Sequence, residues 1–522
     1  MATFRYGIDR LTPGLALDIS RGKIKGELTR EVTGRIQKNR AEVEQIVAEK
    51  RTVYGINTGF GPLCTTLISD EDTRKLQHNL LLSHAVGVGE LISEEISRLM
   101  LILKVHSLAM GYSGISMDTF NRILWHIDNH AIPCVPSQGS VGASGDLAPL
   151  AHLFLPLIGY GKVFYKGSII PATELLTSCG IKPLEPGPKE GLALINGTQF
   201  MAAHAVKFLE RFQQCLDHAD IIAAMNLEAM LGSVKSFDPA LHALRPYDGT
   251  CYVADRMRKL TGNSEIVESH RNCHRVQDPY SLRCIPQVHG ASRNAYLHLK
   301  QLLTIELNSV TDNPIIFSKD KALSGGNFHG QPLALPLDYA ALATAELGNI
   351  ADRRIYLSLM DNIEGLPKLL MKETGLNSGF MIPQYTTAAL VSENKSLCFP
   401  ASADSIPTSL GQEDHVSMGS ISARKAMQIV DNLEKILGIE LFCAAQGFDF
   451  RKPLKSGPMI DACHEHVRRV IPHIDRDIYL GDFINSAINM VRNFELTNLT
   501  DSLSNTLCLD FKNGSHELFG IY

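Results

Sequence analysis

The hydrophobic positions of the chain recur with a helical period over several long stretches. The longest stretch runs from Thr198 to Leu231, 34 residues without a glycine or a proline. A helix of this length reaches roughly 50 Å, well beyond the usual globular helix. Its apolar residues leave only a narrow polar stripe, a pattern typical of a helix buried among others. These residues are Phe200, Met201, Val206, Phe208, Leu209, Phe212, Leu216, Ile221 and Ile222.

Three further segments repeat this pattern, at 292–312, 338–365 and about 420–446. Several long, mostly apolar helices in one chain predict a helical bundle that also packs against copies of itself. Signals for strands are short and few, and GKVFYKGSII at 161–170 predicts a small hairpin. The pattern therefore predicts a mainly α fold.

One segment stands out as a domain boundary. GIKPLEPGPKEG, at 180–191, holds three prolines and three glycines directly before the longest helical stretch. We therefore expect a smaller N-terminal lobe over 1–190 and an elongated helical lobe over 191–522.

Composition and charge exclude several classes of protein. The 522 residues are 44% apolar and 20% charged, and the formal net charge is −5, with both signs well mixed. These values are typical of a globular protein and argue against a nucleic-acid or anionic-membrane partner. Apolar runs such as LMLIL at 99–103 end at Lys104 and are too short to cross a bilayer.

The cysteines and the start of the chain bear on location. Eleven cysteines are scattered without any C-x-x-C pair, which argues against a disulfide framework and a zinc site. The first residues, MATFRYGIDRLTPG, lack a hydrophobic signal region. We therefore expect a cytoplasmic protein without a metal site.

The segment GSVGASGDLAPLAH at 139–152 is unusual for a loop. A phosphate-binding loop needs a nearby cation, but the segment has no Lys or Arg and carries Asp146 after Gly145. A nucleophile elbow, G-x-S-x-G, fails because Gly145 directly follows Ser144. Two interpretations remain: a turn into a helix capped by Asp146, or a backbone that modifies itself.

The residue types at 143–145 suit self-modification. If the amide nitrogen of Gly145 attacks the carbonyl carbon of Ala143, a five-membered ring closes. Loss of one water from the ring and another from the Ser144 side chain leaves an exocyclic methylidene, which is a strong electrophile. Glycine permits the tight bend, alanine leaves the attacked carbonyl uncrowded, and serine supplies the hydroxyl that leaves.

This segment resembles the signature of the ammonia-lyases and aminomutases of aromatic amino acids that use a 4-methylideneimidazole-5-one (MIO) group. Similar segments follow in the family's order along nearly the whole chain. They are VYGINTGFG (53–61), LLLSHAVGVG (80–89), LINGTQF (194–200), VQDPYSLRCIPQ (276–287), TDNP (311–314), SGGNFHG (324–330), GLNSGFMIPQYTTAAL (375–390) and GQEDHVSMGSISARK (411–425).

The resemblance implies a prosthetic group and catalytic residues. Ala143, Ser144 and Gly145 would form MIO autocatalytically, with no external cofactor and no metal. Tyr54 matches the position of the family's base for the β-proton of the substrate. A tyrosine has an ordinary pKa of about 10, so the site must assist its deprotonation. Arg283 matches the clamp for the substrate carboxylate, a role that suits the two-point geometry of a guanidinium.

Other matched positions complete the implied site. Asn196 would lie beside the MIO ring and the substrate, Gln277 would bind substrate, and Tyr280 would support the substrate or the ring. If the segment is helical, Tyr280 and Arg283 share a face. Asp146 would assist the backbone cyclisation, although its position suits a helix-capping role equally well.

Two positions bear on the substrate. His84 lies in the specificity region of the family, where both histidine-specific and tyrosine-specific members carry a histidine. Glu413 matches a glutamate of the histidine-specific branch, where it can bind an imidazole, whereas the tyrosine and phenylalanine branches have an Asn-Gln-Asp type sequence. A buried carboxylate beside a phenyl ring would lack a partner. Alternatively, Glu413 is a helix-start carboxylate. Phe328 is expected to line the same pocket, and Gly411 replaces the branch's usual asparagine.

The resemblance implies elimination of ammonia from L-histidine to give trans-urocanate. A tyrosine or phenylalanine lyase, an aminomutase, and a non-catalytic helical scaffold are the alternatives. The resemblance also implies an elongated multi-helix bundle of the fumarase/aspartase-like type, with a smaller N-terminal lobe. It further implies a homotetramer whose sites are each built from several chains, and a small amino acid as the ligand.

Overall fold

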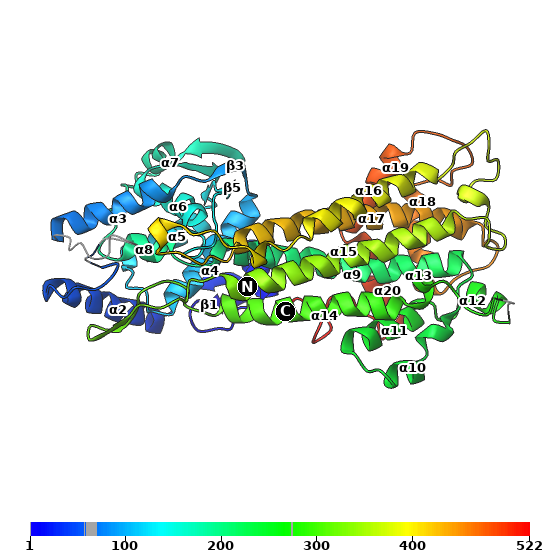
Figure 1. Ribbon diagram of the computed structural model, residues 1–522, viewed down its shortest axis with the longest axis horizontal. Helices are drawn as coiled ribbons and strands as arrows, with labels where there is room; N and C mark the ends of the chain where they lie inside the picture. Colours follow the sequence, from blue (N-terminus) through cyan, green and yellow to red (C-terminus); the bar gives the residue numbers. More distant parts are fainter. Residues whose placement is uncertain (1, 57, 59–69, 273–274) are drawn as a thin grey trace. The chain divides into compact units, whose positions relative to one another are not determined.

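The computed structural model of the chain describes residues 2–56, 58, 70–272 and 275–522 (Figure 1). The described residues are mainly helical, with a few short strands, so the predicted fold class is confirmed. The chain divides into two compact units. Unit 1 comprises Met1–Lys207, Lys300–Asp338 and Pro400–Arg424, and unit 2 comprises Phe208–Leu299, Tyr339–Phe399 and Lys425–Tyr522. Both units are discontinuous in sequence, whereas the lobes 1–190 and 191–522 are continuous; that partition stays a prediction.

The α-helices and strands of unit 1 are β1 (Thr3–Arg5), α1 (Pro13–Ser20), β2 (Lys25–Glu27), α2 (Arg30–Ala48), α3 (Asp70–His84), β3 (Val88–Leu91), α4 (Glu94–Ala109), α5 (Met117–Asp128), β4 (Ile132–Pro133), β5 (Pro136–Gln138), α6 (Leu147–Phe154), β6 (Lys162–Tyr165), β7 (Ser168–Pro171), α7 (Ala172–Ser178), α8 (Glu190–Ile195), β8 (Ile315–Ser318) and β9 (Lys321–Leu323). Those of unit 2 are α10 (Pro239–Ala243), α11 (Asp248–Leu260), α12 (Glu265–Ser269), α13 (Tyr280–Arg283), α16 (Met381–Leu397), α18 (Pro458–Val470), α19 (Gly481–Arg492) and α20 (Glu495–Leu507). Four helices have residues in both units: α9 (Gln199–Ala229), α14 (Ile285–Leu307), α15 (Gln331–Ser358) and α17 (Gly419–Asp449).

The predicted long helices are present. α9 has 31 residues and fills nearly all of the glycine- and proline-free stretch, and α17 also has 31 residues. α14 and α15 begin earlier than the pattern predicts, at Ile285 and Gln331. Each has a proline at its second position, where a helix needs no backbone donor, and α15 also continues through Pro336 in its interior, so these prolines do not delay the start.

Buried ion pairs join the long helices within unit 2. Asp220 of α9 accepts hydrogen bonds from Arg256 of α11 at 2.8 Å and from Arg293 of α14 at 2.5 Å, and it contacts His289 of α14 at 2.8 Å. Burial alone would raise the pKa of Asp220, but Arg293, His289 and Arg256 hold it below its ordinary value. Removing one partner of such a group is strongly destabilising because a buried charge is left unpaired.

The strands of unit 1 form small sheets that shape the approach to one loop. The predicted hairpin is present as β6 and β7, which pair antiparallel with Val163 opposite Ile170, and β4 joins it on the other edge. β3 pairs with β5, and β5 leads directly into the 139–146 segment. Helix α6, which follows this segment, packs against α3 and α8. Three helices therefore lie around the loop that carries Ala143–Gly145.

Two properties of the described residues complete the fold. No helix among them is both long and apolar enough to cross a membrane. Nine cysteines are described, and all nine are free.

Two glycines within α17 provide a matched test of packing in unit 2. A Cβ on Gly438 would lie 2.6 Å from the Cα of Ile488 in α19, whereas a Cβ on Gly447 would meet Ala229 at 3.4 Å. Alanine favours a helix over glycine by about 1 kcal/mol, but overpacking costs about 1–3 kcal/mol. We expect Gly438→Ala to lower the free energy of unfolding and Gly447→Ala to leave it unchanged or raise it. Urea denaturation measures both, and equal effects would contradict this packing.

Candidate active site

Unit 1 contains a cavity of about 1150 Å³. Its wall comes from the end of α3, the loop before α6, the end of α8 and two segments near 313–329 and 409–415. Seven of the residues proposed for the site lie in this wall. They are Tyr54, His84, Ala143, Ser144, Asn196, Phe328 and Glu413.

The loop carrying Ala143–Gly145 has a backbone conformation at Gly142 and Gly145 that favours glycine. Gly142 and Gly145 have φ angles of +70° and +75°, and a Cβ on Gly145 would lie 2.1 Å from the carbonyl oxygen of Gly197. Residues 145 and 197 form an isolated parallel β-bridge. Side chains cannot occupy this contact, so main chain packs directly on main chain.

Hydrogen bonds fix the loop to the segment between α8 and α9. The backbone N–H of Asp146 donates to the carbonyl of Gly197 at 2.7 Å. The Ser144 carbonyl accepts from Nδ2 of Asn196 at 2.7 Å and from the backbone N–H of Gly197 at 3.4 Å. This carbonyl is therefore polarised by two donors on one side.

The segment that precedes α17 holds the other side of the loop. The backbone N–H of Met418 donates to the Val141 carbonyl at 2.9 Å, and the Ser420 hydroxyl donates to the Ser140 carbonyl at 2.7 Å. Ala143 packs in a small apolar cluster with Val416 and Met418. Hydrogen bonds from two different segments therefore hold the loop and limit its conformational freedom.

Asp146 lies at the N-cap position of α6, as the capping interpretation predicts, but its side chain does not cap that helix. The carboxylate accepts from the backbone N–H of Met201 in the first turn of α9 at 3.0 Å and from the Ser140 hydroxyl at 3.3 Å. Complete burial raises the pKa of Asp146 to about 7, although these hydrogen bonds oppose the shift.

Glu413 lies in a loop whose hydroxyl groups hold its carboxylate. The Ser144 hydroxyl donates to Oε1 at 2.8 Å, while Thr408 and Ser409 donate to Oε2 at 2.8 and 2.9 Å. The helix-start interpretation of Glu413 is wrong, because α17 begins only at Gly419 and the carboxylate binds hydroxyls instead.

The loop around Glu413 turns through left-handed backbone. Ser409, Leu410 and Gly411 have φ angles of +51°, +54° and +87°. Thr408 and Glu413 pair as an antiparallel bridge that closes the turn. Gly411, which replaces the expected asparagine, suits this conformation and does not line the described cavity wall.

His84 is the last residue of α3 and forms a half-buried part of the wall. Its Nδ1 lies 3.0 Å from the Ser83 hydroxyl. Burial lowers the pKa of the His84 imidazole, while the Glu413 carboxylate opposes that shift. Elsewhere in the cavity wall, His329, which follows Phe328 in the chain, stacks on His415 with ring centres 5.6 Å apart.

Tyr54 is half-buried in a turn that lines the cavity. Residues 57 and 59–61 of the VYGINTGFG motif lie outside the described residues. Gly55, directly after the tyrosine, has a φ of +73°, and a Cβ there would meet Leu192 of α8 at 2.5 Å. The turn can therefore approach α8 closely.

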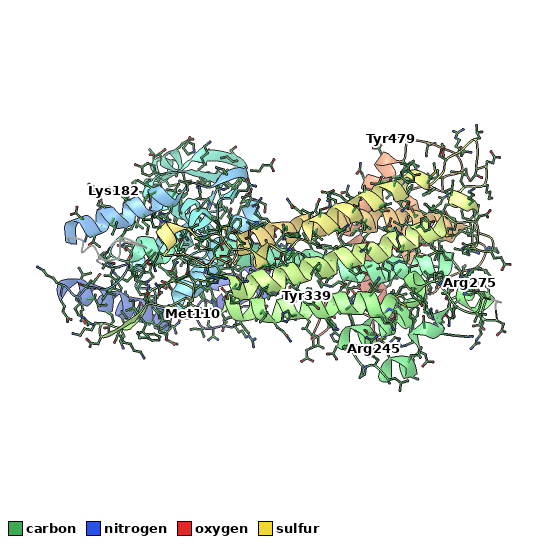
Figure 2. All side chains as sticks on the ribbon, in the orientation of Figure 1. Met110, Lys182, Arg245, Arg275, Tyr339 and Tyr479 are labelled. Atoms are coloured by element: carbon green, nitrogen blue, oxygen red, sulfur yellow. The ribbon has the colours of Figure 1, made fainter. Side chains whose placement is uncertain are left out.

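Gln277, Tyr280 and Arg283 belong to unit 2, and the described residues that line the cavity all belong to unit 1. Gln277 and Tyr280 are exposed. The Arg283 guanidinium lies over the Tyr280 ring at 4.8 Å within α13, so the predicted shared face is confirmed. Arg275, labelled in Figure 2, bonds to Asp278 at 3.0 Å and fixes the start of this segment.

Sequence reasoning missed two sets of residues. Nothing in the sequence indicates the roles of Thr408 and Ser409, because the partners of loop hydroxyls are known only once the loop is folded. Lys104 does have a sequence signal, since it is a single charged residue directly after an apolar run. Its Nζ donates to the Asn196 carbonyl at 2.7 Å from a fully buried position, and burial lowers the pKa of Lys104 to about 7.

Over the described ranges, no group of three or more His, Cys, Asp or Glu could hold a metal ion.

The buried Asp146 makes stability depend on pH. Its folded pKa of about 7 exceeds the ordinary 3.8, so the folded chain holds this proton more tightly. The resulting stabilisation is complete below about pH 4 and is lost as the pH rises through 7. Each tenfold change in proton affinity is worth about 1.4 kcal/mol, giving at most about 4 kcal/mol.

We expect Asp146→Asn to remove this dependence. The comparison is made in a Ser144→Ala background, in which neither chain can lose the serine hydroxyl. Urea unfolding at intervals from pH 4 to pH 8 should show the Ser144→Ala chain losing more stability than the Ser144→Ala/Asp146→Asn chain. Parallel curves would contradict the assignment of the pKa to Asp146.

The chain is similar to known proteins over nearly its whole length. The family model for aromatic amino acid lyases matches residues 11–469. A histidine ammonia-lyase of Natranaerobius thermophilus is 46% identical over 89% of this chain and 92% of its own. The crystal structure of a histidine ammonia-lyase from Trypanosoma cruzi is similar with a TM-score of 0.88, at 40% identity over 96% of this chain and 95% of that one. A tyrosine aminomutase from Streptomyces globisporus has a TM-score of 0.91, at 33% identity over 98% and 100% of the two chains.

Proposed function

The chain belongs to the aromatic amino acid lyase family, and on that premise we propose that it eliminates ammonia from L-histidine to give trans-urocanate. The observation that carries the proposal is the contact between Ser144 and Glu413, 2.8 Å apart in one cavity. It places the residue that would become the electrophile beside a carboxylate suited to an imidazole.

The residues present fit an MIO group made from Ala143, Ser144 and Gly145. Gly145 has a left-handed φ and no room for a side chain, as a tight backbone cyclisation requires. Two donors already hold the Ser144 carbonyl. When formed, the group supplies an electrophilic carbon that makes loss of an amino group and a β-hydrogen feasible.

The side chains around the cavity have separate proposed roles. Glu413 accepts a hydrogen bond from the substrate imidazole, and His84 and Phe328 form the wall beside the ring. Tyr54 removes the β-proton. Asn196 holds the Ser144 carbonyl through Nδ2, and its buried Oδ1, which has no partner among the described residues, is an acceptor for the substrate's amino group.

We further propose that Gln277, Tyr280 and Arg283 complete the cavity of another copy of the chain in a homotetramer. Gln277 and Tyr280 are exposed on unit 2, and Arg283 Nε is buried without a hydrogen-bond partner in the described chain. Arg283 clamps the substrate carboxylate and Tyr280 supports the substrate or the MIO ring. We place the enzyme in the cytoplasm, where free cysteines stay reduced.

The substrate assignment is tested by incubating the purified protein separately with histidine, tyrosine and phenylalanine. We expect a conjugated product, seen by ultraviolet absorption, from histidine. Glu413→Gln, which removes the charge and keeps the shape, should lower kcat/KM for histidine roughly 10- to 100-fold, because a hydrogen bond to a charged group is worth about 1.5–3 kcal/mol. Product from tyrosine but not from histidine would overturn the assignment.

The alternatives are separated by the products of this incubation and by the mass of the chain. The similarity to a tyrosine aminomutase supports a tyrosine lyase or an aminomutase, and formation of a β-amino acid from any of the three substrates would identify the latter. A non-catalytic scaffold would keep its full mass, whereas MIO formation removes two waters from the chain. Intact-mass measurement of the folded protein distinguishes these cases.

The shared site is tested by mixing two inactive chains. Ser144→Ala removes the source of the electrophile and Arg283→Ala removes the carboxylate clamp, so each chain alone should be inactive. Co-expressed chains should regain activity, because some sites then take Ser144 from one copy and Arg283 from another. The control mixture pairs Ser144→Ala with Glu413→Leu, and it should stay inactive because both residues line the same cavity. Equal activity of the two mixtures would contradict a site shared between copies.

A further inference from the structure

Ser144 is held at both ends of the bond that would become double. On one side its hydroxyl donates to Oε1 of Glu413 at 2.8 Å. On the other side its carbonyl oxygen accepts from Nδ2 of Asn196 at 2.7 Å and from the backbone N–H of Gly197 at 3.4 Å. Cα and Cβ of Ser144 lie between these two sets of contacts.

Dehydration of Ser144 changes both atoms of its Cα–Cβ bond, because Cα loses a proton and Cβ loses the hydroxyl. The proton on Cα leaves to cavity water, its electron pair forms the Cα–Cβ π bond, and the Cβ–Oγ bond breaks. The departing hydroxide takes a proton from the cavity water that received the first, so the chain loses one water and no electron is exchanged with another molecule. Donors on the Ser144 carbonyl favour loss of the Cα proton, because they stabilise negative charge that develops on that oxygen. A partner for the hydroxyl fixes the rotamer from which it leaves.

We propose that Glu413 and Asn196 take part in the dehydration of Ser144, before any substrate binds. This inference rests on the proposed function, because it concerns how the electrophile is made. It gives Glu413 two roles in sequence: it holds the serine hydroxyl in the immature chain and the substrate in the mature one.

The contacts of Glu413 explain how one carboxylate serves both roles. Thr408 and Ser409 bind Oε2, so they keep the carboxylate in place whether or not the Ser144 hydroxyl is present. When that hydroxyl leaves, Oε1 loses its donor. A half-buried carboxylate oxygen without a donor is unfavourable, and an N–H of the substrate replaces the lost one. The vacancy that receives the substrate is therefore created by the maturation step itself.

Mass spectrometry of newly made protein tests the proposal without using activity. The full-mass chain, the chain lighter by one water and the chain lighter by two waters report the precursor, a singly dehydrated chain and the finished group. Fragmentation of the 139–152 peptide shows whether Ser144 keeps its hydroxyl. Samples are taken over time from cell-free synthesis, and circular dichroism checks that each variant folds.

We expect Glu413→Leu and Asn196→Ala to keep the Ser144 hydroxyl at least tenfold longer than the wild type. Glu413→Gln should mature close to the wild-type rate, because its amide oxygen still accepts from the hydroxyl, although it uses histidine poorly. Ser83→Ala is the control: it removes another cavity hydroxyl, which bonds to Leu80 and His84 rather than to Ser144. It should mature like the wild type.

Several outcomes overturn the proposal. One is loss of two waters at the wild-type rate in either Glu413→Leu or Asn196→Ala, because the proposal needs both residues. Another is a Glu413→Gln chain that matures as slowly as Glu413→Leu, because the hydroxyl contact would then not be the feature that matters. If Glu413→Leu does not fold, Glu413→Ala takes its place as the variant without an acceptor, and Asn196→Ala is decided independently. A folded wild-type chain that keeps its full mass would overturn the proposed function as well, so the two failures are distinguishable.

Discussion

The approach of Gly145 to the Gly197 carbonyl is the contact on which the rest of the site depends. Any Cβ at position 145 would overlap that oxygen, and Gly197 itself has a φ of +138° with Gln199 2.5 Å from the position of a Cβ. Because Gly197 lies between α8 and α9, this single main-chain contact ties the loop before α6 to two further helices. The Ser144 carbonyl, the Asn196 amide and the Asp146 carboxylate take their positions from it.

Two buried ionisable side chains, Lys104 and Asp146, bind main-chain groups of the segments next to the cavity. Lys104 and Asp146 are both fully buried, and burial moves the pKa of each to about 7. Neither is paired with the other: Lys104 donates to the Asn196 carbonyl, and Asp146 accepts from the first turn of α9. Burial of an ionisable group is costly, and here both groups hold peptide units in place.

Much of the fold and part of the site could be predicted from the sequence. A stretch of 34 residues without glycine or proline predicts α9, and the hairpin at 161–170 follows from its alternation and turn. Helices α14 and α15 begin at Ile285 and Gln331, earlier than the predicted 292 and 338, because each accepts a proline at its second position and α15 also continues through Pro336. For the site, periodicity contributed nothing; the motifs supplied Ser144 and Glu413, which only the fold brings together across 269 residues.

What could not be predicted depends on loops whose course is set by distant contacts. Thr408 and Ser409 bind Glu413 only because the backbone turns through left-handed angles from 409 to 411. Gln277 and Arg283 carry the family's signature, yet they belong to a different compact unit from the cavity. No property of the linear sequence indicates to which compact unit of the fold a residue of these motifs belongs.

The hydrogen bond between Ser144 and Glu413 also limits how such an enzyme can diverge. The proposed roles of Glu413 bring recognition of the substrate side chain and construction of the reactive group to one carboxylate, so a substitution that removes its hydrogen-bond acceptor changes both the substrate preference and the yield of mature protein. A library varied at position 413 and screened by turnover alone would discard side chains that bind a new substrate well but leave the serine intact. Routes to new specificity would then pass through residues such as His84 and Phe328, which line the cavity and, among the described contacts, do not bond to Ser144.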